Sequence, residues 1–260
     1  MTAAVRYSVT GGIAEVRLNR PERLNAIDET MFSGIAEVLR SIGENRAVRV
    51  VVLSGEGRAF CAGLDLECMA RGGAKLDFET RSFGPANLPQ HVAWGWRALR
   101  VPVIAAVHGA AFGGGLQIMC GADIRISHPA TRMAIRETYW GLAPDMAGTA
   151  LWRGLVRDDV LRELVFTARE FSGKEALELG FATLLADEPH EQAMELARTI
   201  AGRSPQAIRA AKRLLNAAID AAPDALLALE TAEQLRLKGT VNQREAISAN
   251  FERRVPRFED

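Results

Sequence analysis

A buried-strand pattern that ends in three consecutive glycines most constrains how this chain can fold. Residues 101–107 form a continuous apolar run, which is typical of a strand buried on both faces. Residues 108–112 are expected to turn the chain, and glycines 113–115 then lead into the helical apolar pattern of residues 116–120. The first amides of a helix have no intrahelical acceptor and carry the positive end of its dipole. Because glycine allows close approach to the backbone, this junction suits an anion, or an oxygen that becomes one.

Close helix packing and phosphate binding each explain the three glycines less well than the binding of an anion or an oxygen does. Glycine also permits a helix to pack closely on a strand, but three glycines in succession at a strand–helix junction favour a functional interpretation. A phosphate-binding loop is disfavoured, because no Gly-Lys-Ser/Thr follows and the GxGxxG spacing is missing.

A second junction of the same design lies earlier in the chain. The buried-strand pattern of residues 48–53 is followed by a turn and then by Ala62 and Gly63, where another helix is expected to begin. Two such junctions would aim two backbone amides at one oxygen. This is the arrangement of an oxyanion hole, in which each donor lowers a reaction barrier by ~3 kcal/mol. The sequence therefore predicts such a site if the two turns meet in space.

Composition and charge exclude several classes of partner. The 260-residue chain carries 32 basic and 32 acidic side chains without a basic block, so nothing favours nucleic acid or an anionic membrane surface. No apolar stretch is long enough to span a bilayer, and the first residues lack an apolar signal core. Three cysteines form no CxxC pair and four histidines show no ligand spacing, which predicts a cytoplasmic location and no metal.

Strand and helix patterns alternate early in the chain and then give way to helices alone. Residues 5–9 and 13–18 predict a hairpin, and Asp28 is expected to cap the helix that follows. Residues 71–89 show little periodicity, and a loop of this length in a compact domain is usually functional or mobile. Residues 71–96 are expected to shape a binding site. We expect an α/β core over residues 1–200 and a helical region over residues 201–260. Further strands are expected at 123–126, 133–135 and 181–185. Helices are expected at 88–99, at 150–167, at 173–180 and throughout the chain from Glu188 onward, where Ser204 is a predicted N-cap. Cys61 and Cys120 are expected to be buried thiols, and Lys212 is expected on a solvated face.

Four segments, in order, carry a resemblance to a known family. They are NRPERLNAI at residues 19–27, AFCAGLDL at 59–66, AAVHGAAFGGGLQIMCGADIRI at 105–126 and ETYWGLAPDMAGT at 137–149. Together they are similar to the crotonase, or enoyl-CoA hydratase/isomerase, family, and SPQAIRAAK at 204–212 fits its C-terminal helix. The resemblance implies a spiral of ββα units with a helical trimerisation region, assembled as a homotrimer or a dimer of trimers.

The resemblance also implies where a substrate binds. An acyl-CoA thioester would place its carbonyl oxygen between the backbone amides of Leu64 and Gly114. Ala62 would lie along the adenine, although Arg23, taken alone, is more simply a solvated surface charge. The CoA-binding residues would be Arg23, Leu24, Ala62 and Asp65.

The acid–base positions depart from the two glutamates of the family's hydratases. Glu137 matches one of them, but Gln117 occupies the other position, and an amide cannot take a proton. Asp145 stands where common hydratases have glycine and where the family's dienoyl-CoA isomerases carry an acid. In an apolar pocket Glu137 and Asp145 would form an acid–base pair, although Asp145 would also suit a helix cap. Trp140, close to Glu137, is assigned to the acyl pocket.

Several functions remain open. Hydration of a trans-2-enoyl-CoA, with Glu137 carrying the proton and Gln117 helping to position water, is the leading assignment. The alternatives are double-bond isomerisation, including that of a 3,5-dienoyl-CoA, and other enolate chemistry on acyl-CoA. A non-catalytic acyl-CoA-binding protein is disfavoured by Glu137 and Asp145, and a nicotinamide-binding α/β protein is a further alternative. No cofactor is expected, because acyl-CoA is the substrate.

Overall fold

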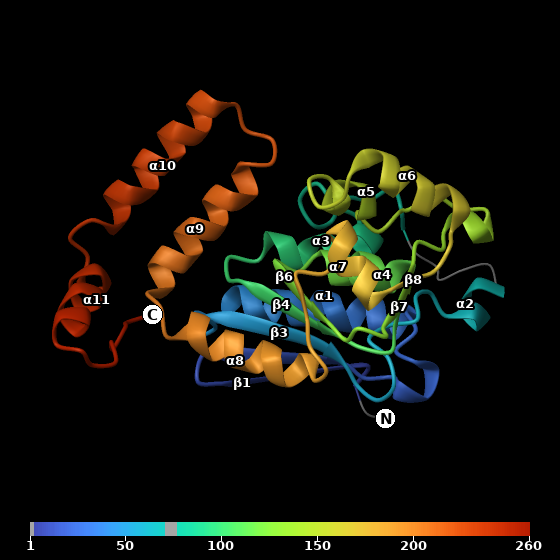
Figure 1. Ribbon diagram of the computed structural model, residues 1–260, viewed down its shortest axis with the longest axis horizontal. Helices are drawn as coiled ribbons and strands as arrows, with labels where there is room; N and C mark the ends of the chain where they lie inside the picture. The colour runs from blue at the N-terminus through green and yellow to red at the C-terminus, as the bar shows by residue number, and fades with distance from the viewer. Residues whose placement is uncertain (1–2, 71–76) are drawn as a thin grey trace.

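The computed structural model describes residues 3–70 and 77–260, and its centre is a mostly parallel sheet (Figure 1). The predicted hairpin is confirmed, and its turn residues Gly11 and Gly12 both have positive φ. Beyond the hairpin every pairing in this sheet is parallel. The sheet has the order β1 (Val5–Thr10), β2 (Ile13–Leu18), β3 (Val50–Gly55), β4 (Val103–Val107), β6 (Ile124–Ser127) and β9 (Leu184–Leu185).

A smaller second sheet begins directly after β4. The sequence predicts a turn over residues 108–112, but β5 (Ala110–Phe112) is a strand that pairs parallel with β7 (Arg132–Ala134), which in turn pairs with β8 (Phe171–Ser172). Gly109, with φ +65°, redirects the chain, and a Cβ there would lie 1.9 Å from Arg58 O. The prediction was wrong because the partner strand lies far away in the sequence and leaves no local pattern.

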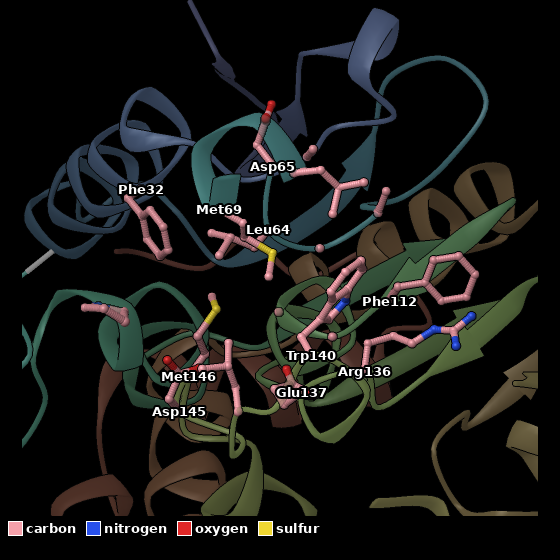
Figure 2. Close-up of a pocket in the computed structure, with 18 of the residues that line it drawn as sticks. Phe32, Leu64, Asp65, Met69, Phe112, Arg136, Glu137, Trp140, Asp145 and Met146 are labelled. Carbon is pink, nitrogen blue, oxygen red and sulfur yellow. The ribbon is translucent and has the colours of Figure 1, made fainter. Parts of the chain in front are cut away.

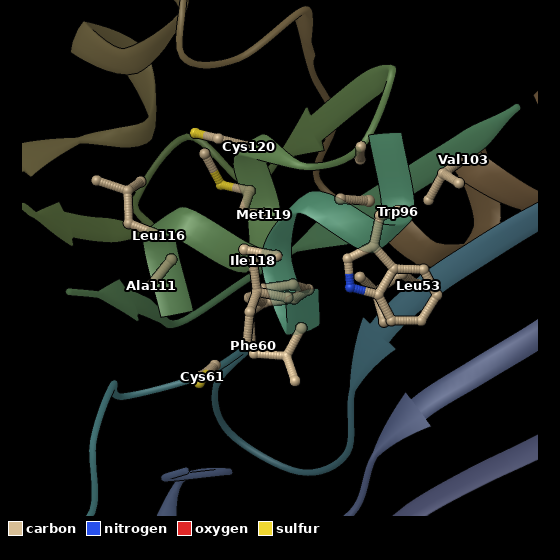
Figure 3. Close-up of a cluster of buried hydrophobic side chains, with 14 of the residues drawn as sticks. Leu53, Phe60, Cys61, Trp96, Val103, Ala111, Leu116, Ile118, Met119 and Cys120 are labelled. Atoms are coloured by element: carbon tan, nitrogen blue, oxygen red, sulfur yellow. The ribbon is translucent and has the colours of Figure 1, made fainter. Parts of the chain in front are cut away.

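Helices cover both faces of the large sheet. The α8 helix (Pro189–Ala201) packs on one face, against alternate residues of β3 and β4. On the other face lie α1 (Glu29–Glu44), α3 (Leu88–Ala98) and α4 (Gly114–Cys120). Figure 3 shows this part of the core, where Trp96, Ile118 and Met119 lie between the helices and the sheet. Asp28 caps α1 as predicted, because its Oδ1 accepts the Met31 N–H at 2.9 Å.

The region predicted as one helix over residues 150–167 is two helices. They are α5 (Gly148–Trp152) and α6 (Asp158–Thr167), and α7 (Gly173–Leu179) follows. Gly154, between the first two, has φ +78°, a left-handed conformation that ends a helix. The apolar spacing continues across this break, which is why the sequence pattern did not reveal it.

The last three helices project away from the sheet (Figure 1). They are α9 (Pro205–Ala217), α10 (Pro223–Leu237) and α11 (Val241–Phe251), and Ser204 caps the first as predicted. Lys212 is not on a solvated face, since its side chain is 6% exposed and its Nζ lies 2.7 Å from Asp123 Oδ2 and 2.8 Å from Val101 O. Through these two contacts Lys212 holds α9 against the core. Within residues 3–70 and 77–260, no helix has the length and apolar character needed to cross a bilayer.

Candidate active site

The two glycine junctions lie side by side. The Phe112 N–H donates to Cys61 O at 3.1 Å, so the junction that contains Ala62 and Gly63 runs parallel to β5. A Cβ on Gly63 would lie 2.7 Å from Phe112 O and 3.9 Å from Gly114 N. A Cβ on Gly115 would lie 2.3 Å from Cys61 O. The absence of side chains therefore allows two backbone segments, distant in sequence, to approach each other closely.

The amides of Leu64 and Gly114 lie at this meeting point. Ile27 donates to Gly63 O at 2.8 Å and accepts the Asp65 N–H at 3.0 Å, so the intervening Leu64 N–H points to the other side of the segment. Gly114 is the first residue of α4, where an amide has no intrahelical acceptor. In the described part of the chain, neither N–H has a hydrogen-bond acceptor, and both residues line the same cavity.

This cavity has a volume of about 430 Å³ and contains all but one of the predicted site residues in its lining. Figure 2 shows Glu137 and Asp145 on one side, with Leu64 and Met69 facing them. The exception is Gln117. The predicted residues in the lining are Arg23, Leu24, Ala62, Leu64, Asp65, Gly114, Glu137, Trp140 and Asp145.

Much of the remaining lining is apolar and was missed by sequence reasoning. Phe32 lies on α1, Met69 on α2 (Leu66–Ala70) and Met146 on the loop before α5. Such residues in helical or loop patterns look the same whether they face a core or a cavity. Phe78 and Pro89 belong to the segment expected to shape the site, whose residues 71–76 lie outside the described part.

Glu137 presents an unsatisfied carboxylate oxygen. The residue is 8% exposed, and it precedes the short 3₁₀ helix η2 (Thr138–Trp140). Its Oε1 accepts a hydrogen bond from Gln117 Nε2 at 2.6 Å, but its buried Oε2 has no partner among the described residues. Burial raises the pKa of this carboxyl and the Asp145 charge adds to the rise, while the hydrogen bond from Gln117 opposes it. A buried carboxyl oxygen without a partner is uncommon and points to a functional role.

Gln117 lies behind Glu137 and outside the lining of the cavity. Its side chain is fully buried on α4. Its Oε1 accepts the N–H groups of Met146 at 3.0 Å and Gly148 at 2.8 Å. The Gln117 amide therefore makes hydrogen bonds to the Glu137 carboxylate and to two backbone N–H groups. It does not face the space where a substrate would bind.

Asp145 lies on the open wall of the cavity. Its side chain is exposed, yet partial burial still raises its pKa. The alternative role of helix cap is not found, because α5 begins after Ala147 without any side-chain cap. Two carboxyl groups with raised pKa values thus share one wall.

The residues expected to hold CoA line the mouth of the cavity but differ in how freely they can bind a ligand. Arg23 forms an exposed ion pair with Glu67 at 2.8 Å. Leu24 ends the 3₁₀ helix η1 (Pro21–Arg23), and its carbonyl accepts the Ala62 N–H at 3.0 Å. Asp65 is already engaged, because its carboxylate lies 3.2 Å from Arg20 and accepts the Glu67 N–H at 3.0 Å.

Trp140 and the two buried cysteines complete the set of predicted residues. Trp140 is 49% exposed and lines the cavity. Cys61 and Cys120 are buried as predicted, and burial raises their pKa values to about 12 and about 11, respectively. Such thiols stay protonated at neutral pH and are poor nucleophiles. Across the described ranges, no cluster of His, Cys, Asp and Glu is arranged to hold a metal ion.

Comparisons with known proteins identify the family. A family profile described as enoyl-CoA hydratase/isomerase matches residues 8–260. The short-chain-enoyl-CoA hydratase of Clostridium acetobutylicum is 33% identical over 248 residues, which cover 94% of this chain and 93% of that protein. The peroxisomal Delta(3,5)-Delta(2,4)-dienoyl-CoA isomerase of Arabidopsis thaliana is 28% identical, with 98% of this chain and 95% of that protein covered. The chain belongs to the enoyl-CoA hydratase/isomerase family, as its motifs predicted.

Solved structures agree with this assignment. The crystal structure of enoyl-CoA hydratase from Mycobacterium tuberculosis H37Rv matches with a TM-score of 0.88 at 27% identity and 99% coverage of both chains. The enoyl-CoA hydratase from Bacillus anthracis matches with a TM-score of 0.87 at 27% identity and 98% coverage of both. The predicted crotonase-like α/β fold is confirmed, and the protein is an enzyme of the hydratase/isomerase type.

Proposed function

We propose that this enzyme moves a proton on an enoyl-CoA thioester whose carbonyl oxygen lies between the amides of Leu64 and Gly114. The observation that carries the proposal is the shared cavity, in which two amides without acceptors and one carboxyl oxygen without a partner lie together in the described part of the chain. An enolate gains negative charge on the thioester oxygen, and fixed N–H donors stabilise that charge without having to reorganise. Glu137 is the group that takes or returns the proton.

The rest of the cavity suits the two ends of such a substrate. Arg23 at the mouth supplies a positive charge for a CoA phosphate, in competition with Glu67. Trp140, Phe32 and Met146 offer an apolar wall for the acyl chain. Proton transfer through an enolate uses only substrate, protein and water, so we propose that no cofactor takes part.

Replacing Glu137 by glutamine tests the proposal. Glu137→Gln keeps the volume and an oxygen for the Gln117 donor, but removes the proton carrier. We expect kcat on enoyl-CoA substrates to fall by about 10²- to 10⁴-fold, while a non-reactive acyl-CoA still binds with unchanged affinity. The matched control is Glu178→Gln, an exposed glutamate on α7. Unchanged turnover in Glu137→Gln would refute the role, and binding of acyl-CoA without turnover in the unaltered protein would favour a binding function.

The projecting helices support self-association, and we propose the trimer, or dimer of trimers, that the resemblance implies. Large apolar side chains stay exposed along them in a single chain, and a second copy of the chain would cover them. The three cysteines are all free, which supports a reducing compartment such as the cytoplasm. The exposed apolar residues of this region are Leu215, Ile219, Leu227, Leu235, Val241, Ile247, Phe251 and Val255.

A further inference from the structure

The orientation of the Gln117 amide is fixed by its surroundings. Its oxygen accepts two backbone N–H groups, from Met146 and Gly148, so its NH₂ group must face Glu137. The distance from Gln117 Nε2 to Glu137 Oε1 is 2.6 Å. A carboxylate at position 117 would place oxygen against oxygen there and would need a proton to keep the contact. The amide therefore holds Glu137 without competing for its proton.

This contact leaves Glu137 with one oxygen for the substrate. Oε1 is engaged by Gln117, while Oε2 has no partner within the described residues. Gln117 is fully buried and absent from the cavity lining, so a water in the cavity cannot bridge the side chains at positions 117 and 137. Adding water to a double bond requires a group that orients and deprotonates that water. Moving a double bond along the acyl chain requires only a single carboxylate that takes a proton and returns it.

We propose that Gln117 is a positioning residue that commits Glu137 to carrying a proton between two carbons, so that the enzyme converts a 3-enoyl-CoA to a 2-enoyl-CoA rather than hydrating the latter. The inference rests on the proposed function of the same site. The Glu137 carboxylate takes a proton from the α-carbon, and the electron pair of that C–H bond moves into the thioester to form a dienolate. Protonated Glu137 then returns the proton to the γ-carbon, so the α–β double bond forms as the β–γ double bond breaks. Water is neither consumed nor released.

The test compares two reactions in one preparation. The full-length protein is given trans-3-hexenoyl-CoA and trans-2-hexenoyl-CoA in separate assays, and the migration and hydration rates are expressed as a ratio. We expect migration to exceed hydration by about tenfold or more in the unaltered chain, a difference of about 1.4 kcal/mol in barrier. Hydration as fast as migration would overturn the inference, and so would rapid hydration that Asp145→Asn abolishes, because Asp145 would then be serving a water.

A Gln117→Glu variant separates positioning from a merely structural role. A second carboxyl beside Glu137 raises the pKa of the pair, so the acidic limb of the migration rate should move to higher pH and the migration-to-hydration ratio should fall by about tenfold. Gln206→Glu, an exposed position on α9, makes the same change in charge as a control. An unchanged ratio and pH limb in Gln117→Glu would overturn the inference.

The two proposals fail in different ways. If neither substrate reacts, or if Glu137→Gln keeps full migration activity, the proposed function fails and this inference fails with it. If Glu137 proves essential but the main product is the hydrated one, only the inference about Gln117 fails. The ratio in the unaltered chain needs no variant, so it decides the question even if Gln117→Glu does not fold.

Discussion

Adding one methyl group at Gly63 should separate the two amides on which the proposed chemistry depends. Gly63 has φ +90°, a conformation that costs about 1–3 kcal/mol for a residue with a side chain. Its Cβ would also lie 2.7 Å from Phe112 O, well inside van der Waals contact and against a backbone atom that cannot rotate away. Gly63→Ala must therefore push the Leu64 segment away from the segment that leads into α4.

The expected loss of rate follows from the proposed contacts of the Leu64 and Gly114 amides with the thioester oxygen. Loss of one such donor typically lowers kcat by about 10²- to 10³-fold, so we expect Gly63→Ala to lose about a hundredfold in kcat. Gly154→Ala is the control, because Gly154 has φ +78° but no atom within 4 Å of an added Cβ. Gly154→Ala therefore has the same kind of backbone strain as Gly63→Ala, but its added Cβ makes no close contact.

Two measurements separate strain from displacement of the amides. Urea denaturation should show a loss of stability of about 1–3 kcal/mol in both variants, with a larger loss in Gly63→Ala. Steady-state kinetics should show near-normal turnover in Gly154→Ala alone. If folded Gly63→Ala turned over substrate as fast as Gly154→Ala, the meeting of the two junctions would have no catalytic importance and the reasoning would be wrong.

Three other predictions concern the charge of Glu137, the proposed CoA-binding residue Arg23 and the proposed self-association. Burial raises the pKa of Glu137, so its ionisation destabilises the folded state as pH rises past the ordinary carboxyl range. In thermal scans across pH, Glu137→Gln should therefore melt at a higher temperature than the unaltered chain at neutral pH, and this gain should vanish under acidic conditions. Arg23→Ala should raise KM for a CoA ester by about fivefold at low salt with kcat unchanged, and the effect should shrink as salt is added; equal KM values at low salt would contradict a phosphate contact. Leu235→Asp, on the exposed side of α10, should lower the mass measured by sedimentation relative to the unaltered chain; an unchanged mass would exclude this face from the interface.

Local patterns were sufficient to predict much of the fold. The hairpin, the cap at Asp28 and the cap at Ser204 each depend on residues within a few positions of one another. The sequence did not reveal β5, whose partner is β7, or the burial of Lys212, whose partner Asp123 lies 89 positions away. Contacts of this kind depend on how elements pack, and a single sequence without its fold contains no periodic signal for them.

In the candidate site, too, some residues could be predicted from local sequence and others depend on how the elements pack. The glycine junctions could be identified from the sequence because each follows a buried-strand pattern and contains glycine, and Glu137 could be identified because its segment resembles the family's motif. The place of Gln117 could not, because it depends on the Met146 and Gly148 amides about thirty positions further along the chain. The apolar lining at Phe32 was also missed, since an apolar helical position looks the same beside a cavity or in a core.

The pairing of Cys61 with Ala111 has a consequence for how this protein's relatives diverge. The junctions meet through main-chain hydrogen bonds and at glycines, so we expect substitutions of neighbouring side chains other than these glycines to leave the Leu64 and Gly114 amides in place. We therefore expect that the side chains at positions 117 and 145 can differ between relatives without moving the two amides that we propose bind the substrate oxygen. Relatives with other reactions should therefore be sought among proteins that keep the two meeting junctions, and their residues at the positions of Gln117 and Asp145 should be compared.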